Sequence, residues 1–150
     1  MPQSLVKNYL HITFSTKNRH PFIDEHIKDE LFSYLGGICK NLECNPIRVG
    51  GYLDHIHILC LLSRKIALMK LIEEVKTHSS KWIKTKGQKY QKFYWQNGYG
   101  GFSIHESQVE FVKSYILSQE EHHKKSSFKD EYRSFLKEYD IDFDERYVWD

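Results

Sequence analysis

Residues 52–62 read YLDHIHILCLL, an apolar run that carries two histidines two positions apart. A continuous apolar segment of this length, after a turn residue, is typical of a buried strand. Side chains alternate between the two faces of a strand, so Ile56 and Ile58 are expected on the face that packs against helices. His55 and His57 then share the opposite face. The run therefore predicts a strand that presents a pair of imidazoles on one side of a sheet.

Strands and helices alternate around this run in a definite order. Period-2 and helical spacing of apolar residues predict a strand, a helix, two strands, a helix, a strand and two further helices. Their approximate ranges are 9–14, 24–42, 46–52, 55–62, 68–82, 99–104, 107–123 and 127–139. This order matches the split βαβ arrangement of a ferredoxin-like fold in the α+β class. Such a fold has a four-stranded antiparallel sheet with helices on one face, and we expect the other face to be open.

The bulk properties fit one domain over residues 1–150. The chain is 40% hydrophobic and 28% charged, which is ordinary for a globular protein. Its three cysteines have no CxxC spacing, which favours reduced thiols in a cytoplasmic protein. No signal peptide is expected at the start, and no apolar stretch approaches the roughly 20 residues needed to span a bilayer.

Charge is distributed unevenly, although the formal net charge is only +2. Residues 75–105 contain no Asp or Glu, and acidic residues gather in a tail after Glu138. The basic window, as we call residues 75–105, predicts a surface for single-stranded nucleic acid, with lysines for phosphates and aromatic rings for bases. Its lysines are Lys76, Lys81, Lys84, Lys86, Lys89 and Lys92, and its aromatic residues include Trp82, Tyr90, Phe93, Tyr94 and Trp95. Trp82 and Phe93 equally fit a hydrophobic core.

Tyr115 and Gln119 lie four residues apart on the helix predicted over 107–123, so they share one helical face. The sequence SQVE at 107–110 predicts a capping box at its start. His122 and His123 are neighbours on the same helix, where side chains point about 100° apart, and we expect them to chelate poorly.

The paired imidazoles can converge on one ion, because residues i and i+2 of a strand lie roughly 6.5–7 Å apart on the same side. Nine histidines in the chain also make a chance pair plausible. Imidazole accepts Zn²⁺, Cu and Mn²⁺ alike, so the ligand type does not select the metal. Asp54 fits either of two roles, as a turn residue or as the partner that fixes an imidazole tautomer.

Three motifs together resemble a known family. HIH at 55–57, WQNGYGGFS at 95–103 and YILSQEEHH at 115–123 resemble the single-tyrosine transposases of the IS200/IS605 type, which belong to the HUH endonucleases. The resemblance runs from the first strand to the third helix. It implies that Tyr115 is the nucleophile, that His55 and His57 are the metal pair and that Gln119 is the third ligand.

The resemblance also implies an activity, a cofactor and partners. Family members use Mg²⁺ or Mn²⁺ and cut single-stranded DNA beside imperfect hairpins through a 5′-phosphotyrosine. They are homodimers in which the tyrosine helix of one subunit can complete the histidine site of the other. We therefore expect a DNA strand transferase that acts in the cytoplasm, at the nucleoid.

Two other functions are compatible with the residues. One is a domesticated module that binds hairpins or single-stranded nucleic acid without strand transfer. The other is a metal-dependent hydrolase that uses water, which the lack of an Asp/Glu cluster near the histidines disfavours.

Overall fold

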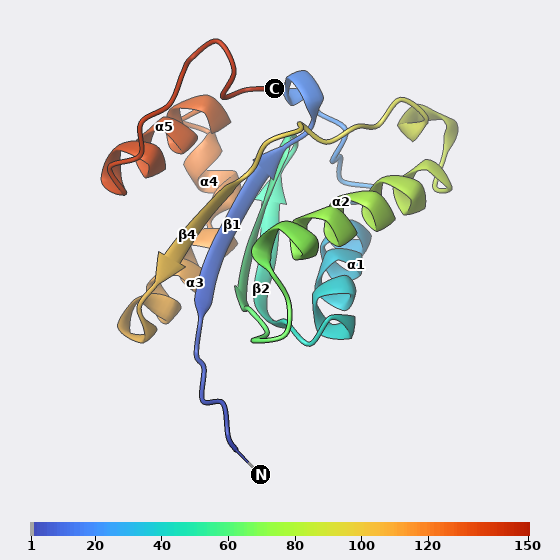
Figure 1. The fold of residues 1–150 in the computed structure, drawn as a ribbon. Coiled ribbons are helices and arrows are strands. Elements are labelled where there is room, and N and C mark those ends of the chain that lie inside the picture. Colours follow the sequence, from blue (N-terminus) through green and yellow to red (C-terminus); the bar gives the residue numbers. More distant parts are fainter. Residues whose placement is uncertain (1) are drawn as a thin grey trace.

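Four antiparallel strands form the centre of the molecule in the computed structural model, which describes residues 2–150 (Figure 1). The strands are β1 (Tyr9–Ser15), β2 (Asn45–Tyr52), β3 (His55–Leu61) and β4 (Gly100–Ile104). They are ordered β2-β3-β1-β4, so β3 and β1 occupy the middle of the sheet. The predicted ferredoxin-like α+β fold is confirmed by this order and by the antiparallel pairing of neighbouring strands.

Helices α1 (Lys28–Asn41) and α2 (Leu68–Lys84) cover one face of the sheet (Figure 1). The main hydrophobic core lies between them and the strands, and it includes Ile12, Phe14, Leu31, Leu35, Ile56, Ile58, Leu71 and Val75. Burying each such side chain contributes roughly 1.5–3 kcal/mol before the entropy of ordering is subtracted. This core fixes the direction of β3, and the alternation of β3 then directs the two histidines to the other face.

That other face is covered, and the expectation that it is open was wrong. Helices α3 (Val109–Leu117), α4 (Gln119–His123) and α5 (Phe128–Glu138) lie across it (Figure 1). Two smaller apolar clusters hold them there: Leu59 with Val112 and Ile116, and Phe102 with Phe128, Tyr132 and Leu136. The physical reason is that Leu59 of β3 and Phe102 and Ile104 of β4 give this second face its own apolar surface, which also has to be buried.

The helix predicted over 107–123 is interrupted. A 3-10 turn, η3 (Glu106–Gln108), precedes α3, and Ser118 separates α3 from α4. The predicted capping box does not form, because the amide of Ser107 donates instead to Nδ1 of His105 at 3.1 Å. Ser118 donates its hydroxyl hydrogen bond to the backbone oxygen of Ser114 at 2.9 Å, a local bond that competes with regular helix.

Gly50 lets α3 lie directly on β2. A Cβ atom at Gly50 would be 2.8 Å from Cγ2 of Ile116 and 3.2 Å from its backbone oxygen, whereas a Cβ at Gly37 of α1 would meet nothing within 4 Å. We expect Gly50→Ala to lower the free energy of unfolding by about 1–3 kcal/mol, as overpacking does. Gly37→Ala should raise it by about 0.5–1 kcal/mol, because alanine favours a helix interior. Urea unfolding of the two variants measures this contrast, and equal stabilities would contradict the close approach.

The acidic tail folds back onto its own chain. The backbone oxygen of Asp150 accepts from the amide of Gly98 at 2.9 Å, and Arg19 donates to the backbone oxygen of Trp149 at 2.9 Å. Two guanidinium hydrogen bonds of 2.7 and 3.1 Å join Arg133 of α5 to Glu145. These contacts tie α5 to the edge of the sheet. Within residues 2–150, none of the helices combines the length and the apolar character that a membrane span requires.

Candidate active site

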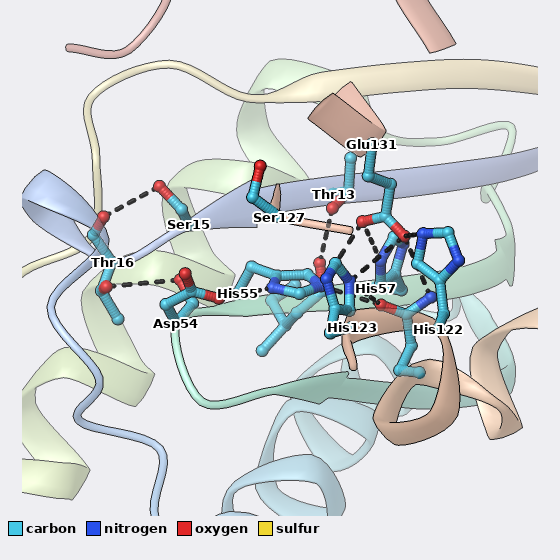
Figure 2. A network of polar contacts seen from close by, with 12 residues as sticks. Thr13, Ser15, Thr16, Asp54, His55, His57, His122, His123, Ser127 and Glu131 are labelled. Atoms are coloured by element: carbon cyan, nitrogen blue, oxygen red, sulfur yellow. Dashed lines mark hydrogen bonds and ion pairs between the residues drawn. The ribbon is translucent and has the colours of Figure 1, made fainter. Parts of the chain in front are cut away.

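The paired imidazoles of β3 lie on the sheet face beneath α3, α4 and α5, as the alternation predicted. His55 and His57 are both fully buried, and their ring centroids are 5.1 Å apart. Figure 2 shows both rings beside side chains from the C-terminal helices. The two histidines therefore belong to a cluster of buried polar side chains.

Asp54 fixes the tautomer of His55. Nδ1 of His55 is 2.7 Å from Oδ1 of Asp54, and a carboxylate only accepts, so Nδ1 carries the proton. In the neutral ring Nε2 then keeps its lone pair, and it lies 2.8 Å from Oε1 of Gln119, which is itself an acceptor. A lone pair and an amide oxygen converge here, as the ligands of a cation do. Asp54 therefore has both of the roles considered for it, since it also lies in the turn between β2 and β3.

His11 of β1 is a functional candidate that sequence reasoning missed. Its Nε2 lies 2.8 Å from Nδ1 of His57, and both rings are buried. Burial lowers the pKa of His11 to about 3 and also lowers the pKa of His57, so both rings are neutral near pH 7. The available signal was period-2 alternation, which places His11 on the opposite face of β1 from Ile12.

Tyr115 reaches the same cluster from α3 of the same chain. Its hydroxyl donates a hydrogen bond to a carboxylate oxygen of Glu131, and Nε2 of His122 lies 3.5 Å from that hydroxyl. The rings of Tyr115 and His57 have centroids 5.9 Å apart. Burial and the adjacent carboxylate of Glu131 raise the pKa of Tyr115, so its phenol is protonated at neutral pH.

Glu131 of α5 is the second missed residue, and it sits at the centre of the cluster (Figure 2). Its Oε1 lies 3.0 Å from Nε2 of His57 and 3.4 Å from Nε2 of His55, while its Oε2 accepts from Nε2 of Gln119 at 3.1 Å. Burial alone would raise the pKa of Glu131, but the neighbouring imidazoles hold it well below its usual range. A signal was present, because Glu131 interrupts the apolar face of an amphipathic helix next to Tyr132.

The adjacent histidines of α4, which were expected to chelate poorly, both turn toward Glu131. Nε2 of His122 and of His123 lie 3.3 and 3.4 Å from Oε2 of Glu131. Nδ1 of His123 donates to the backbone oxygen of Ser126 at 2.7 Å, which leaves Nε2 facing Oε1 of Gln119 at 2.9 Å. The chain turns at Lys124, just beyond this pair, so α4 is only one turn long.

The donor atoms fit a divalent cation. One nitrogen each of His55 and His57 and one oxygen of Glu131 lie within 4.8 Å of one another, and Oε1 of Gln119 adjoins them. Neutral imidazoles with carboxylate and amide oxygens suit Mn²⁺ and related metals, and the oxygens also suit Mg²⁺. Within residues 2–150 a second group of this kind combines His122, His123 and Glu131.

Tyr90 and Phe93 of the basic window are buried in the hydrophobic core, and Lys76 and Trp95 are also engaged inside the protein. The ammonium group of Lys76 donates to the backbone oxygens of residues 96–98 at 2.8, 3.1 and 2.8 Å, and burial lowers its pKa to about 8. Trp95 is buried and donates its indole hydrogen bond to the hydroxyl of Ser79 at 2.9 Å. Neither side chain is presented to a partner.

The other basic residues of the window are not gathered at the imidazoles. Lys81 and Lys84 are on α2, which covers the opposite face of the sheet, and Lys86, Lys89, Lys92 and the exposed Tyr94 follow it. Lys89 pairs with Asp24 at 2.9 Å, and the ammonium of Lys84 lies 4.3 Å from the ring centre of Tyr94. Lys89, Lys92 and Tyr94 do share a surface hollow with Lys17 and His20.

A His–apolar–His pair lies on a central strand, and a tyrosine from a neighbouring helix lies beside it. The family model described as "Transposase IS200 like" matches residues 4–119, and the chain belongs to this family. The match includes His11, the histidine pair, Tyr115 and Gln119, and it ends before α5.

Two solved structures share the fold. One is a transposase-like protein from Deinococcus radiodurans, with a TM-score of 0.62 and 18% identity, covering 79% of this chain and 98% of that one. The other is a REP-associated tyrosine transposase bound to a REP hairpin, with a TM-score of 0.59 and 12% identity, covering 82% of this chain and 73% of that one. Among curated protein sequences, none matches significantly.

Proposed function

We propose that this protein cleaves and rejoins single-stranded DNA beside hairpins through a covalent 5′-phosphotyrosine on Tyr115. Mg²⁺ or Mn²⁺ would be held by His55, His57 and Gln119. The observation that carries the proposal is the meeting of the Tyr115 phenol and the two imidazoles around one carboxylate in a single chain. Membership of the IS200-like transposases supports it.

The reaction begins with Tyr115. Its phenol oxygen attacks the scissile phosphorus, the bond from phosphorus to the 3′ oxygen breaks, and a 5′-phosphotyrosine forms. The phenol proton leaves toward the nearest acceptor, the Glu131 carboxylate, and the departing 3′ oxygen takes up a proton from the solvent. One ester replaces another of similar energy, so the 3′ hydroxyl of a second DNA end can reverse the attack and join strands without ATP.

The rings of His55 and His57 are held in fixed orientations by their neighbours. Asp54 keeps the proton of His55 on Nδ1, and the contact with His11 keeps the His57 ring in place. Both Nε2 atoms therefore face the carboxylate of Glu131. A divalent cation bound there would polarise the scissile phosphate and stabilise the charge that develops on its oxygens.

DNA is proposed to approach from the side of Tyr115. A surface hollow of about 520 Å³ opens there and is lined by Phe111, Ser114, Tyr115, Ser118, Glu121, His122, Lys125 and Ser126. The hairpin bound by a structural neighbour supports hairpin DNA as the partner. Because Tyr115 lies beside the imidazoles of its own chain, a homodimer with exchanged helices is not required for a complete site.

A covalent adduct is the test of this proposal. A library of single-stranded DNAs, each with a hairpin and randomised flanking bases, is incubated with the protein and Mn²⁺. We expect a protein–DNA adduct that survives denaturation, and mass spectrometry of the digested adduct should place the nucleotide on the peptide that contains Tyr115. If the library binds but no adduct forms in Mn²⁺ or Mg²⁺, the proposed strand transfer is contradicted. The protein would then be a module that binds hairpin DNA without cutting it.

A further inference from the structure

Glu131 has no counterpart in the matched part of the family, because the match ends at residue 119 and α5 begins at Phe128. Yet its carboxylate is 3% exposed and contacts His55, His57, Gln119 and Tyr115, the four residues of the proposed site. A carboxylate is almost never buried unless it is paired. Its burial at this point needs a cation or several hydrogen-bond donors.

The charge of the site favours an anionic ligand. Two neutral imidazoles and one amide supply no negative charge to a divalent cation, and these three side chains are shielded from water, since His55, His57 and Gln119 are at most 1% exposed. An uncompensated charge is costly in such surroundings. Among the acidic residues that the structure describes, Glu131 and Asp54 touch the imidazoles, and Asp54 is already the hydrogen-bond partner of His55.

The distances between donor atoms agree with shared coordination. Neighbouring ligands of an octahedral ion with bonds of 2.0–2.1 Å lie about 3 Å apart. Here Nε2 of His55 is 2.8 Å from Oε1 of Gln119, and Oε1 of Glu131 is 3.0 and 3.4 Å from Nε2 of His57 and His55. Without a metal, Nε2 of His57 donates a hydrogen bond to the carboxylate, and a bound cation would take the place of that proton. We propose that Glu131 is a fourth ligand of the catalytic metal, contributed by a helix outside the family match.

The second carboxylate oxygen has a separate task. Oε2 of Glu131 accepts the hydrogen bond of the Tyr115 phenol, so one side chain links the metal ligands to the nucleophile. Four protein donors leave about two positions of a six-coordinate ion for phosphate oxygens. These oxygens would come from the hollow beside Tyr115 and His122. The inference rests on the metal site of the proposed function, and it gives α5, which its apolar residues fix against the sheet, a part in that site.

Metal binding without DNA is the first test. Isothermal titration with Mn²⁺ compares the whole wild-type chain with Glu131→Gln and with Glu138→Gln, whose side chain is exposed on the same helix. We expect Glu131→Gln to bind Mn²⁺ at least about tenfold more weakly, and Glu138→Gln to bind it as the wild type does. An affinity of Glu131→Gln within threefold of wild type, or tighter, would overturn the proposal.

The visible spectrum of bound Co²⁺ gives a second readout that a merely structural role would not move. Loss of a carboxylate ligand should shift the ligand-field bands of Glu131→Gln at saturating Co²⁺, and unchanged bands would count against ligation. His57→Ala separates the two proposals. If His57→Ala binds Mn²⁺ like the wild type, the metal site itself is misplaced. If His57→Ala loses Mn²⁺ while Glu131→Gln keeps it, Glu131 alone was wrongly assigned.

Discussion

Tyr115→Phe is expected to abolish the covalent adduct and to lower strand cleavage by roughly 10³-fold or more, because no other group replaces a missing nucleophile. The substitution removes one hydroxyl and keeps the ring that packs near His57 and Phe135. The fold and the Mn²⁺ affinity should therefore change little. Single-turnover cleavage of a labelled hairpin DNA measures the effect.

Tyr147→Phe is the matched control, since the side chain of Tyr147 is 63% exposed in the C-terminal segment and outside the site. It should cleave at the wild-type rate. Cleavage by Tyr115→Phe at a rate within tenfold of wild type would contradict the role of the phenol. In that case water would be the nucleophile, and a metal-dependent hydrolase would be favoured over a strand transferase.

His57→Ala carries the second large effect. We expect it to lower the affinity for Mn²⁺ by about 100-fold and to remove cleavage, because it deletes one nitrogen donor and leaves the Glu131 carboxylate with one fewer partner. Chelation of the wild-type protein with EDTA should likewise stop cleavage, and added Mn²⁺ should restore it. His26→Ala, an exposed site on the approach to α1, is the control and should behave as wild type.

Loss of a buried side chain also affects stability, so unfolding of His57→Ala is measured in parallel. Because the buried carboxylate of Glu131 loses a partner, the free energy of unfolding should fall by about 1–3 kcal/mol. Cleavage that persists in EDTA, or in folded His57→Ala at the wild-type rate, would contradict a metal held by this pair.

The sequence was sufficient for the parts of the site that depend on local periodicity. Alternation along β3 predicted that His55 and His57 share a face, and the structure places both beside Glu131. The spacing of Tyr115 and Gln119 predicted a shared face of one helix; Ser118 interrupts that helix, and both side chains nevertheless contact Glu131. The prediction for β3 depends on strand geometry alone, and distant packing does not change it.

What the sequence could not supply depends on tertiary packing. Glu131 joins the site because α5 docks on the sheet through Phe128, Tyr132 and Leu136, and no local pattern states which surface an amphipathic helix covers. The prediction that the basic window contacts nucleic acid was wrong at Lys76 and Trp95 for a similar reason. Lys76 binds backbone oxygens, and Trp95 packs in the core. Residue type alone does not separate a phosphate-binding lysine from one that binds carbonyl groups.

The position of a bound metal tests the account most directly. Crystals grown with Mn²⁺ are measured at a wavelength where manganese scatters anomalously. The account predicts one strong peak within about 2.5 Å of Nε2 of His55 and Nε2 of His57, with the phenol oxygen of Tyr115 facing it. A well-ordered site without a peak, or a peak away from both imidazoles, would contradict it.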